Sequence, residues 1–467
     1  MYMHDVNFWM ANNSIQAFEM VSSTQYNSEA LDLICIGFGV TALSLAVALH
    51  EKKSLDNALF LETQPQSSWK PYPDIPSERL RTSFLNDLIT SENPRSRFTF
   101  MNYLHATNRL IVYANSSRIT PSRELFAEYL RWCADNLHVR KEFSKKVDKI
   151  VPVKNSTGRV SSWKVFFVDV ATGKLEVAEA KQVICATEPE PRVPAILSQA
   201  HVRPVVAHST ETLEVVPASL KRTGGRGRIA IVGDGQSAAE VFDYVQSIRG
   251  DHQTIWYTRE NVFRTSDGSP FLQDVVRQPA TSAARILPAE LRRQALDLRS
   301  SEVDDELLRT IYDSQYRQSV KQSDPSKWQH QIKVGRELTS AERMTGDKVV
   351  LGFKTSGDEE RHTDSYDLVI AATGFVKTDH QAIMQQLFEL VEGPGISVDR
   401  NYQVNFRSGM LARGCGLWLQ GSIGEANNDD EAVFPTLAER SRRAVESIVQ
   451  QRQQPSESSV EERSARL

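Results

Sequence analysis

The sequence has few cysteines and pairs none of them. Its four cysteines are scattered among 467 residues and form no C-x-x-C motif. This argues against a thiol redox centre, a zinc site and a disulfide framework, so we expect no bound metal. A reducing compartment, the cytoplasm, fits this usage best.

An excess of positive charge is also missing. The chain has 55 lysine and arginine residues against 59 acidic ones, a net charge of -4, so no basic surface favours nucleic acid. One uncharged run, residues 33–49, approaches the about 20 residues that cross a bilayer. Glycines interrupt that run, and residues 229–245 repeat its pattern with charges inside it. The start of the chain lacks the order of a signal peptide. We therefore expect neither nucleic acid nor a membrane as a partner.

Residues 31–49, LDLICIGFGVTALSLAVAL, have the pattern of a strand, a glycine turn and a helix. In this pattern Gly37 makes the turn, Gly39 lets the backbone approach a pyrophosphate, and Ala42 lets the helix pack closely on the sheet. The next predicted strand, NALFLET, reaches Glu62, at the position where an acid binds ribose hydroxyls. The first turn is therefore predicted to bind a dinucleotide with an unphosphorylated ribose.

Residues 229–245, IAIVGDGQSAAEVFDYV, repeat this pattern with Gly233 and Gly235. The strand that follows, TIWYTRE, reaches Arg259 instead of a carboxylate, and a guanidinium suits the 2′-phosphate of NADPH. The alternative is a solvated arginine paired with neighbouring Glu260. We expect FAD on the first turn and NADPH on the second, with hydride passing between them.

The order of the motifs predicts an α/β fold with two Rossmann-like dinucleotide-binding domains and a small helical substrate lobe. Two further apolar strands, KQVICAT and YDLVIAATGF, indicate where the chain crosses between the domains. Residues 288–322 have helical spacing, which predicts either a lid over the substrate or a helical pair that closes the domain. The expected divisions are a weakly ordered leader at 1–29, an FAD domain at 30–205 and 366–448, an NADPH domain at 206–365 with the helical lobe at about 268–330, and a disordered tail at 449–467.

The stretch from Trp69 to His105 has little periodicity and is predicted to be a structured loop. It contains SFLNDLIT and PRSRFTFMNYLH. Together with RLIVYANSSRITPSRELFAEYLRWCA and GQSAAE, these segments resemble the flavin-dependent N-hydroxylating monooxygenases, which hydroxylate the side-chain amine of ornithine or lysine for siderophores. The resemblance covers about residues 31–448.

The resemblance implies a mechanism that needs no nucleophile or base from the protein. NADPH would reduce FAD, oxygen would add at flavin C4a, and an uncharged amine would attack the resulting hydroperoxide. The protein would exclude water and hold the nicotinamide near the flavin. It also implies a homo-oligomer, a tetramer by analogy. Leu80 and Arg81 would lie at the flavin face, with loop packing and a surface charge as the alternatives. The other residues assigned to the cofactors are Trp69, Ser237, Arg259, Thr373 and Gly374.

The sequence departs from the family where the substrate is expected. The family's SFLKDL lysine, which reaches the substrate carboxylate, is Asn86 here. Matching other segments of the chain with the family pattern places three more changed residues in the predicted substrate pocket: Gln273, Arg299 and Asp430. Arg81 and Arg299 are suited to a substrate carboxylate, so we predict a substrate other than ornithine, such as L-aspartate hydroxylated at its α-amine. L-Ornithine is the alternative, in which case these residues are solvent-facing replacements.

Other functions stay open. A two-domain flavin monooxygenase that acts on sulfur or a ketone usually carries a Phe-Gly-His linker, of which VRPVVAHSTETL keeps only His208 and Ser209. A disulfide reductase would need paired cysteines. A nucleotide-binding sensor without turnover would explain the changed pocket, and a colourless protein that takes up no FAD would identify it.

Overall fold

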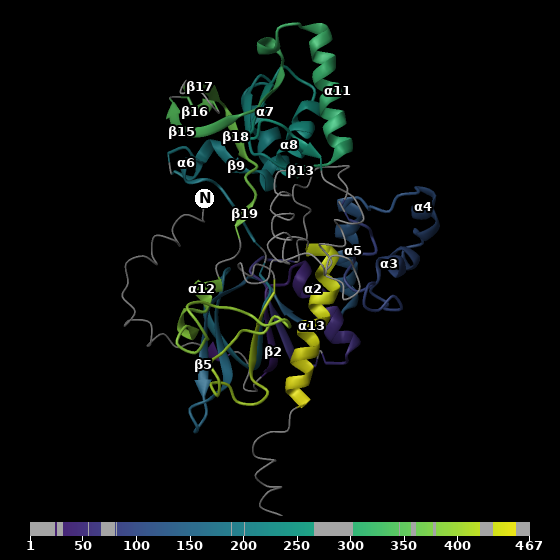
Figure 1. Ribbon diagram of the computed structural model, residues 1–467, viewed down its shortest axis with the longest axis vertical. Helices are drawn as coiled ribbons and strands as arrows, with labels where there is room; N and C mark the ends of the chain where they lie inside the picture. Colours follow the sequence, from purple (N-terminus) through teal and green to yellow (C-terminus); the bar gives the residue numbers. More distant parts are fainter. Residues whose placement is uncertain are drawn as a thin grey trace, which may run out of the picture.

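The chain forms two lobes, each built on its own sheet. The structure, a computed structural model, describes residues 24–25, 31–54, 56–66, 80, 82–187, 189–199, 201–265, 302–344, 346–355, 361–376, 380–420 and 433–453. One lobe contains α2 (Val40–Glu51) and α13 (Val433–Gln453), and the other contains α7 (Thr212–Arg222), α8 (Gln236–Ser247) and α11 (Asp305–Lys321) (Figure 1).

The first sheet contains the first predicted glycine turn. Its strands run in the order β4-β3-β2-β7-β6-β5, and β1 and β20 also pair with β7. β2 is parallel to β3 and β7, whereas β5, β6 and β7 pair antiparallel. Because β20 comes from the C-terminal part of the chain, this sheet is discontinuous in sequence. The strands are β1 (Thr24–Gln25), β2 (Leu31–Ile36), β3 (Ala58–Leu61), β4 (Arg140–Glu142), β5 (Lys145–Lys154), β6 (Val160–Asp169), β7 (Leu175–Cys185) and β20 (Gly416–Leu419).

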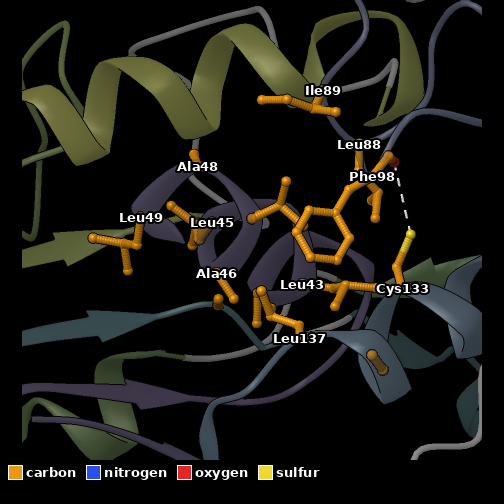
Figure 2. Packing of buried hydrophobic residues seen from close by; sticks show 14 of the residues in the cluster. Leu43, Leu45, Ala46, Ala48, Leu49, Leu88, Ile89, Phe98, Cys133 and Leu137 are labelled. Carbon is orange, nitrogen blue, oxygen red and sulfur yellow. Dashed lines mark hydrogen bonds between the residues drawn. The ribbon is translucent and has the colours of Figure 1, made fainter. Parts of the chain in front are cut away.

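Helix α2 is the centre of the first core. Its residues from Thr41 to Leu49 are all buried, as expected for a helix that is apolar on every side. Leu43, Leu45 and Leu49 lie among side chains from the segments that follow (Figure 2). Helix α13 continues past residue 449, where the tail was expected to begin. The other helices on this side are α3 (Phe100–Ala106), α4 (Leu110–Asn115), α5 (Arg123–Asn136) and α12 (His380–Ile383), with a 3-10 turn, η7 (Gln385–Leu387).

The second sheet is parallel throughout, in the order β14-β11-β10-β18-β9. Its strands are β9 (Val206–His208), β10 (Arg228–Val232), β11 (Gln253–Tyr257), β14 (His330–Lys333) and β18 (Leu368–Ala371). β18 lies beyond residue 366, the expected boundary, so the chain leaves this sheet only after Ala371. Together the two sheets confirm the predicted α/β fold with parallel strands.

Shorter elements complete the second lobe and join it to the first. Strands β15 (Arg336–Met344), β16 (Lys348–Thr355) and β17 (Arg361–Tyr366) form an antiparallel sheet. β8 (Glu190–Pro191) pairs antiparallel with β19 (Phe375–Val376), so the two segments by which the chain crosses between the lobes lie side by side (Figure 1). The remaining elements are α6 (Ala195–Ser198), η2 (Arg203–Val205), η3 (Ser209–Glu211), η6 (Pro325–Lys327), β12 (Arg264–Thr265) and β13 (Glu302–Val303).

The uncharged run at residues 33–49 divides into strand β2, a turn and helix α2, which has only 12 residues. Within the ranges given above, no helix has the length and apolar character needed to cross a bilayer.

Candidate active site

The first glycine turn joins β2 to α2, as the sequence predicts. Gly37 has a φ of +97°, where other residues are strained, and a Cβ there would lie 2.7 Å from the carbonyl oxygen of Ala186. Gly39 is the N-cap of α2, and no side chain among the described residues caps this helix start. A helix start of this kind suits a bound anion such as a pyrophosphate. Ala42 is fully buried against the core, which allows the predicted close packing of the helix.

Glu62 lies directly after β3 and reaches back to this turn. One carboxylate oxygen accepts a hydrogen bond from the backbone N–H of Phe38 over 2.7 Å, and the other accepts from the N–H of Gln64 over 2.9 Å. The carboxylate is thereby held where the second strand ends. This is the position at which an acid can accept hydrogen bonds from a ribose.

The second glycine turn joins β10 to α8. A Cβ on Gly233 would collide with the carbonyl oxygen of Ala372, so the turn needs glycine for space alone. Gly235 is the N-cap of α8, again without a side-chain cap in the part of the chain that the structure covers. Ser237 lies half-buried in the first turn of α8. The predicted strand, turn and helix are therefore present a second time.

Arg259 pairs with Asp234 in the glycine turn, a partner that the sequence did not indicate. Its contact with a 2′-phosphate stays a prediction. The Arg259 Nε donates to the Asp234 carboxylate over 2.8 Å, and the Arg259 backbone N–H donates to the other carboxylate oxygen over 2.8 Å. The hydroxyl of Thr258 also donates to Asp234, over 3.0 Å. The second turn thus has a carboxylate at the end of its second strand, as the first turn does.

Thr373 and Gly374 lie where the chain leaves the second sheet. The Thr373 hydroxyl donates to the carbonyl of Arg192 over 2.5 Å, and the Arg192 N–H donates to the carbonyl of Gly374 over 2.9 Å. The Nε2 of buried His208 lies 3.0 Å from the same Gly374 carbonyl, and burial lowers the pKa of His208. A carbonyl only accepts, so this nitrogen carries the proton. The residues predicted to bind cofactor here form the junction between the lobes.

The predicted substrate loop is held by its own side chains. The Leu80 N–H donates to the carbonyl of Pro121 over 2.9 Å. Asn86 is buried, and its amide donates to the hydroxyl of Thr82. Asp87, which the sequence analysis did not single out, accepts from the N–H of Phe100 over 2.6 Å and from Ile89 and Thr90. Burial raises the pKa of Asp87, and these hydrogen bonds oppose the rise. Asp87 therefore fixes the loop on which Asn86 lies.

A buried ion pair joins the two lobes close to this loop. Arg123, at the start of α5, binds the Glu240 carboxylate with two hydrogen bonds of 3.0 and 2.6 Å. The Glu240 side chain is fully buried, and the Arg123 side chain is 12% exposed. Gln236, one turn earlier on α8, also donates to Glu240, over 2.8 Å. The GQSAAE motif contains both residues at a spacing of i and i+4, which places them on one helix face. Its partner Arg123 lies too far away in sequence to be found from the motif.

The structure therefore brings Leu80 close to the start of α5, through the carbonyl of Pro121, and joins α5 to helix α8. The other predicted flavin, cofactor and substrate residues lie outside the described residues: Trp69, Arg81, Gln273, Arg299 and Asp430. In the part that is described, both turns fit a dinucleotide, because each combines a required glycine, a helix start without a side-chain cap and a carboxylate at a strand end.

Comparisons with known proteins agree with this geometry. The family model described as L-lysine 6-monooxygenase/L-ornithine 5-monooxygenase matches residues 29–377. An L-ornithine N(5)-monooxygenase from Ajellomyces capsulatus is 33% identical over 429 residues, which is 90% of each chain. An L-ornithine N(5)-monooxygenase from Pseudomonas aeruginosa is 30% identical and covers 80% of this chain and 85% of its own.

Solved structures give the same result. The ornithine hydroxylase PvdA from Pseudomonas aeruginosa superimposes with a TM-score of 0.80 at 25% identity, covering 91% of this chain and 100% of its own. The ornithine N-hydroxylase KtzI from Kutzneria, a complex named for reduced FAD, NADP+ and L-ornithine, has a TM-score of 0.79 at 27% identity and the same coverage.

These matches confirm the predicted resemblance, the enzyme class of flavin-dependent N-hydroxylating monooxygenases and the cofactor pair of FAD and NADPH that this class uses. The chain belongs to the L-lysine 6-monooxygenase/L-ornithine 5-monooxygenase family.

Proposed function

We propose that the chain hydroxylates the side-chain nitrogen of L-ornithine, with FAD on the first glycine turn and NADPH on the second. The main support is that a relative named for this activity is 33% identical over 90% of both chains. This replaces an acidic amino acid as the first candidate, because relatives that are 32% to 33% identical are named for ornithine.

In this proposal FAD and NADPH supply the electrons and the activation of oxygen, and the chain binds and orients the reactants. Gly37, Gly39 and Glu62 hold the FAD pyrophosphate and ribose. Ser237 and Arg259 face the NADPH phosphates. The junction at Thr373 and Gly374 keeps the two turns in a fixed relation, which a hydride transfer requires.

The division of the chain is proposed accordingly. Residues 30–205, with the C-terminal part that supplies β20 and α13, form the FAD domain. The NADPH domain begins near residue 206 and extends through β18, and α11 belongs to its helical lobe. A cytoplasmic location, a role in siderophore or secondary-metabolite synthesis, and a homo-oligomer, a tetramer by analogy with the family, complete the proposal.

Asn86 is the observation that favours a second candidate. Its neutral amide is buried, so this position supplies no positive charge to a substrate carboxylate. The second candidate is therefore an acidic amino acid such as L-aspartate, bound by Arg81 and Arg299, which lie outside the described residues.

A substrate screen separates the candidates. Purified protein would be incubated with NADPH, oxygen and one of L-ornithine, L-lysine, cadaverine or L-aspartate, and both the hydroxylated amine and hydrogen peroxide would be measured. We expect hydroxylated product from L-ornithine in excess of peroxide. Product from L-aspartate alone would replace the first candidate by the second. A colourless protein that takes up no FAD and oxidises no NADPH would reject both in favour of a nucleotide-binding sensor.

Charge at position 86 gives an independent test with two variants. Asn86→Asp keeps the shape of the side chain and adds a negative charge, whereas Asn86→Lys adds a positive one. If L-ornithine binds with its carboxylate near this position, the aspartate variant raises its KM and the lysine variant lowers it, with NADPH-driven flavin reduction unchanged. Opposite shifts would support a substrate group of the opposite charge.

A further inference from the structure

The second turn carries opposite charges where the 2′ position of the coenzyme ribose is expected. Asp234 accepts four hydrogen bonds from the two residues that follow β11: one from the Thr258 hydroxyl, one from the Arg259 N–H and two from the Arg259 guanidinium. The Asp234 side chain is only 14% exposed, whereas the Arg259 side chain is 70% exposed. The carboxylate is therefore the fixed member of the pair, and the arginine is the one that is free to move toward solvent.

The charge of Arg259 is already compensated. Its hydrogen bonds to Asp234 are the main cause that raises its pKa, and the carboxylates of Glu260 and Glu337 add to this effect. A 2′-phosphate carries about two negative charges near neutral pH. The attraction between this phosphate and Arg259 would therefore be opposed by the repulsion between the phosphate and Asp234. A 2′-hydroxyl, in contrast, can donate a hydrogen bond to that carboxylate, as proposed for the FAD ribose and Glu62.

We propose that the second turn accepts NADH as well as NADPH, and that Asp234 sets the balance by competing with the 2′-phosphate for Arg259. This inference rests on the proposed role of the second turn in binding the reducing coenzyme. It makes Asp234 a specificity-determining residue, because selectivity is a difference between two affinities and a repulsive group lowers one of them.

The test compares Asp234→Asn, which removes the charge and keeps the shape, with Asp243→Asn. Asp243 lies on α8, the helix that follows the turn, and accepts a hydrogen bond from Gln246, so its substitution removes an equal charge elsewhere. For each FAD-loaded protein, calorimetry would give the affinity for 2′,5′-ADP and for AMP, and stopped-flow absorbance would give flavin reduction by NADPH and by NADH.

We expect the unaltered protein to reduce its flavin with either coenzyme, with ratios of reduction rate constant to coenzyme dissociation constant within about tenfold of each other. Asp234→Asn should raise the preference for NADPH, and for 2′,5′-ADP over AMP, by about tenfold through the dissociation constant. Asp243→Asn should leave the preference unchanged. In an Arg259→Gln background the effect of Asp234→Asn should be clearly smaller, because the competition for the guanidinium is then absent and only the direct repulsion between Asp234 and the phosphate remains.

The inference is overturned if Asp234→Asn leaves both ratios unchanged, or if its full effect persists without Arg259. Hydroxylated amine is measured separately from flavin reduction. A protein with the expected coenzyme ratios but no hydroxylated L-ornithine would therefore contradict the proposed substrate and leave this inference standing.

Discussion

The two glycine turns reach a similar arrangement from different residues. In the first turn the acid, Glu62, follows the second strand and reaches back to the turn. In the second turn the acid, Asp234, lies between the two glycines and reaches forward to the end of the strand. Both place a carboxylate at the same point of the strand-turn-helix-strand unit. The comparison shows that acids at different sequence positions of the motif can place their carboxylates at the same point in space.

Gly37 and Gly233 also differ in the reason that each position requires glycine. Gly37 has a positive φ and lies against the Ala186 carbonyl, so both its backbone and its surroundings exclude a side chain. At Gly233 the only obstacle to a side chain is the lack of room beside the Ala372 carbonyl. Each turn thus lies against the residue that directly follows a strand of its own sheet, β7 or β18, and the two turns are built independently.

The largest effect is expected from the contact that connects these independent sites. Arg123→Gln leaves the Glu240 carboxylate buried without its cation, which should lower the free energy of unfolding by about 3–5 kcal/mol. Denaturant unfolding would measure this loss. Flavin reduction by NADPH should slow in the same variant, because α8 would lose its link to α5.

Arg109→Gln is the control for this variant, since Arg109 pairs with Glu128 at the surface of the first lobe. Its loss should lower the free energy of unfolding much less than the loss of Arg123 does, because water screens an exposed ion pair. Equal stability of the two variants would contradict a structural role for the buried pair.

Alanine at each turn should separate the two sites. Gly37→Ala and Gly233→Ala should each cost about 1–3 kcal/mol, from strain in the first case and from the carbonyl contact in the second. We expect Gly37→Ala protein to lose flavin on purification, as measured by absorbance. Gly233→Ala protein should keep its flavin and be reduced slowly by NADPH. Loss of flavin from both variants would show that the turns are not independent.

Glu62→Gln tests the acid of the first turn by itself. The amide keeps the size of the side chain but weakens its hydrogen bonds to the Phe38 and Gln64 N–H groups. The dissociation constant for FAD should rise about tenfold, as measured by fluorescence titration. The coenzyme preference at the second turn should stay as it was, and a change there would point to a cofactor arrangement other than the proposed one.

The smallest effect concerns a buried histidine in the second sheet. Burial, with a contribution from nearby His252, lowers the pKa of His330 from 6.5 to about 4. Below pH 6.5 this histidine binds a proton in the unfolded chain but stays neutral in the folded chain. The free energy of unfolding therefore falls as the pH drops toward 4 and then levels off.

Between pH 7 and pH 6 this loss should stay below about 1 kcal/mol. Thermal unfolding followed at both pH values would show it, and His330→Gln should flatten the difference. A pH dependence that survives this substitution would assign the effect to other groups.

The sequence predicted the parts of the fold that local patterns determine. The glycine turns, the buried helix after each and the helix at residues 305–321 followed from apolar periodicity and backbone requirements. The domain boundary after Ala371 could not be predicted in this way, because β18 has the apolar composition of a buried strand in either sheet.

The site was predictable only where the partners are close in sequence. Gln236 and Glu240 lie on one helix face, but Arg123 is 117 residues away from Glu240 and contacts it only through the packing of one lobe on the other. The sequence does not indicate the pairing of Arg259 with Asp234 for a similar reason, since Asp234 lies 25 residues earlier and Glu260 is the adjacent carboxylate. Contacts across a turn depend on the register of parallel strands, which a single sequence does not specify.

The pairing of β8 with β19 has a consequence for how this architecture can change. Because the inserted lobe starts and finishes at one paired ribbon, it can be exchanged as a cassette without stretching the parent sheet. A chimera that receives the corresponding lobe of another enzyme would take on the coenzyme preference of that enzyme and keep its own flavin-binding lobe.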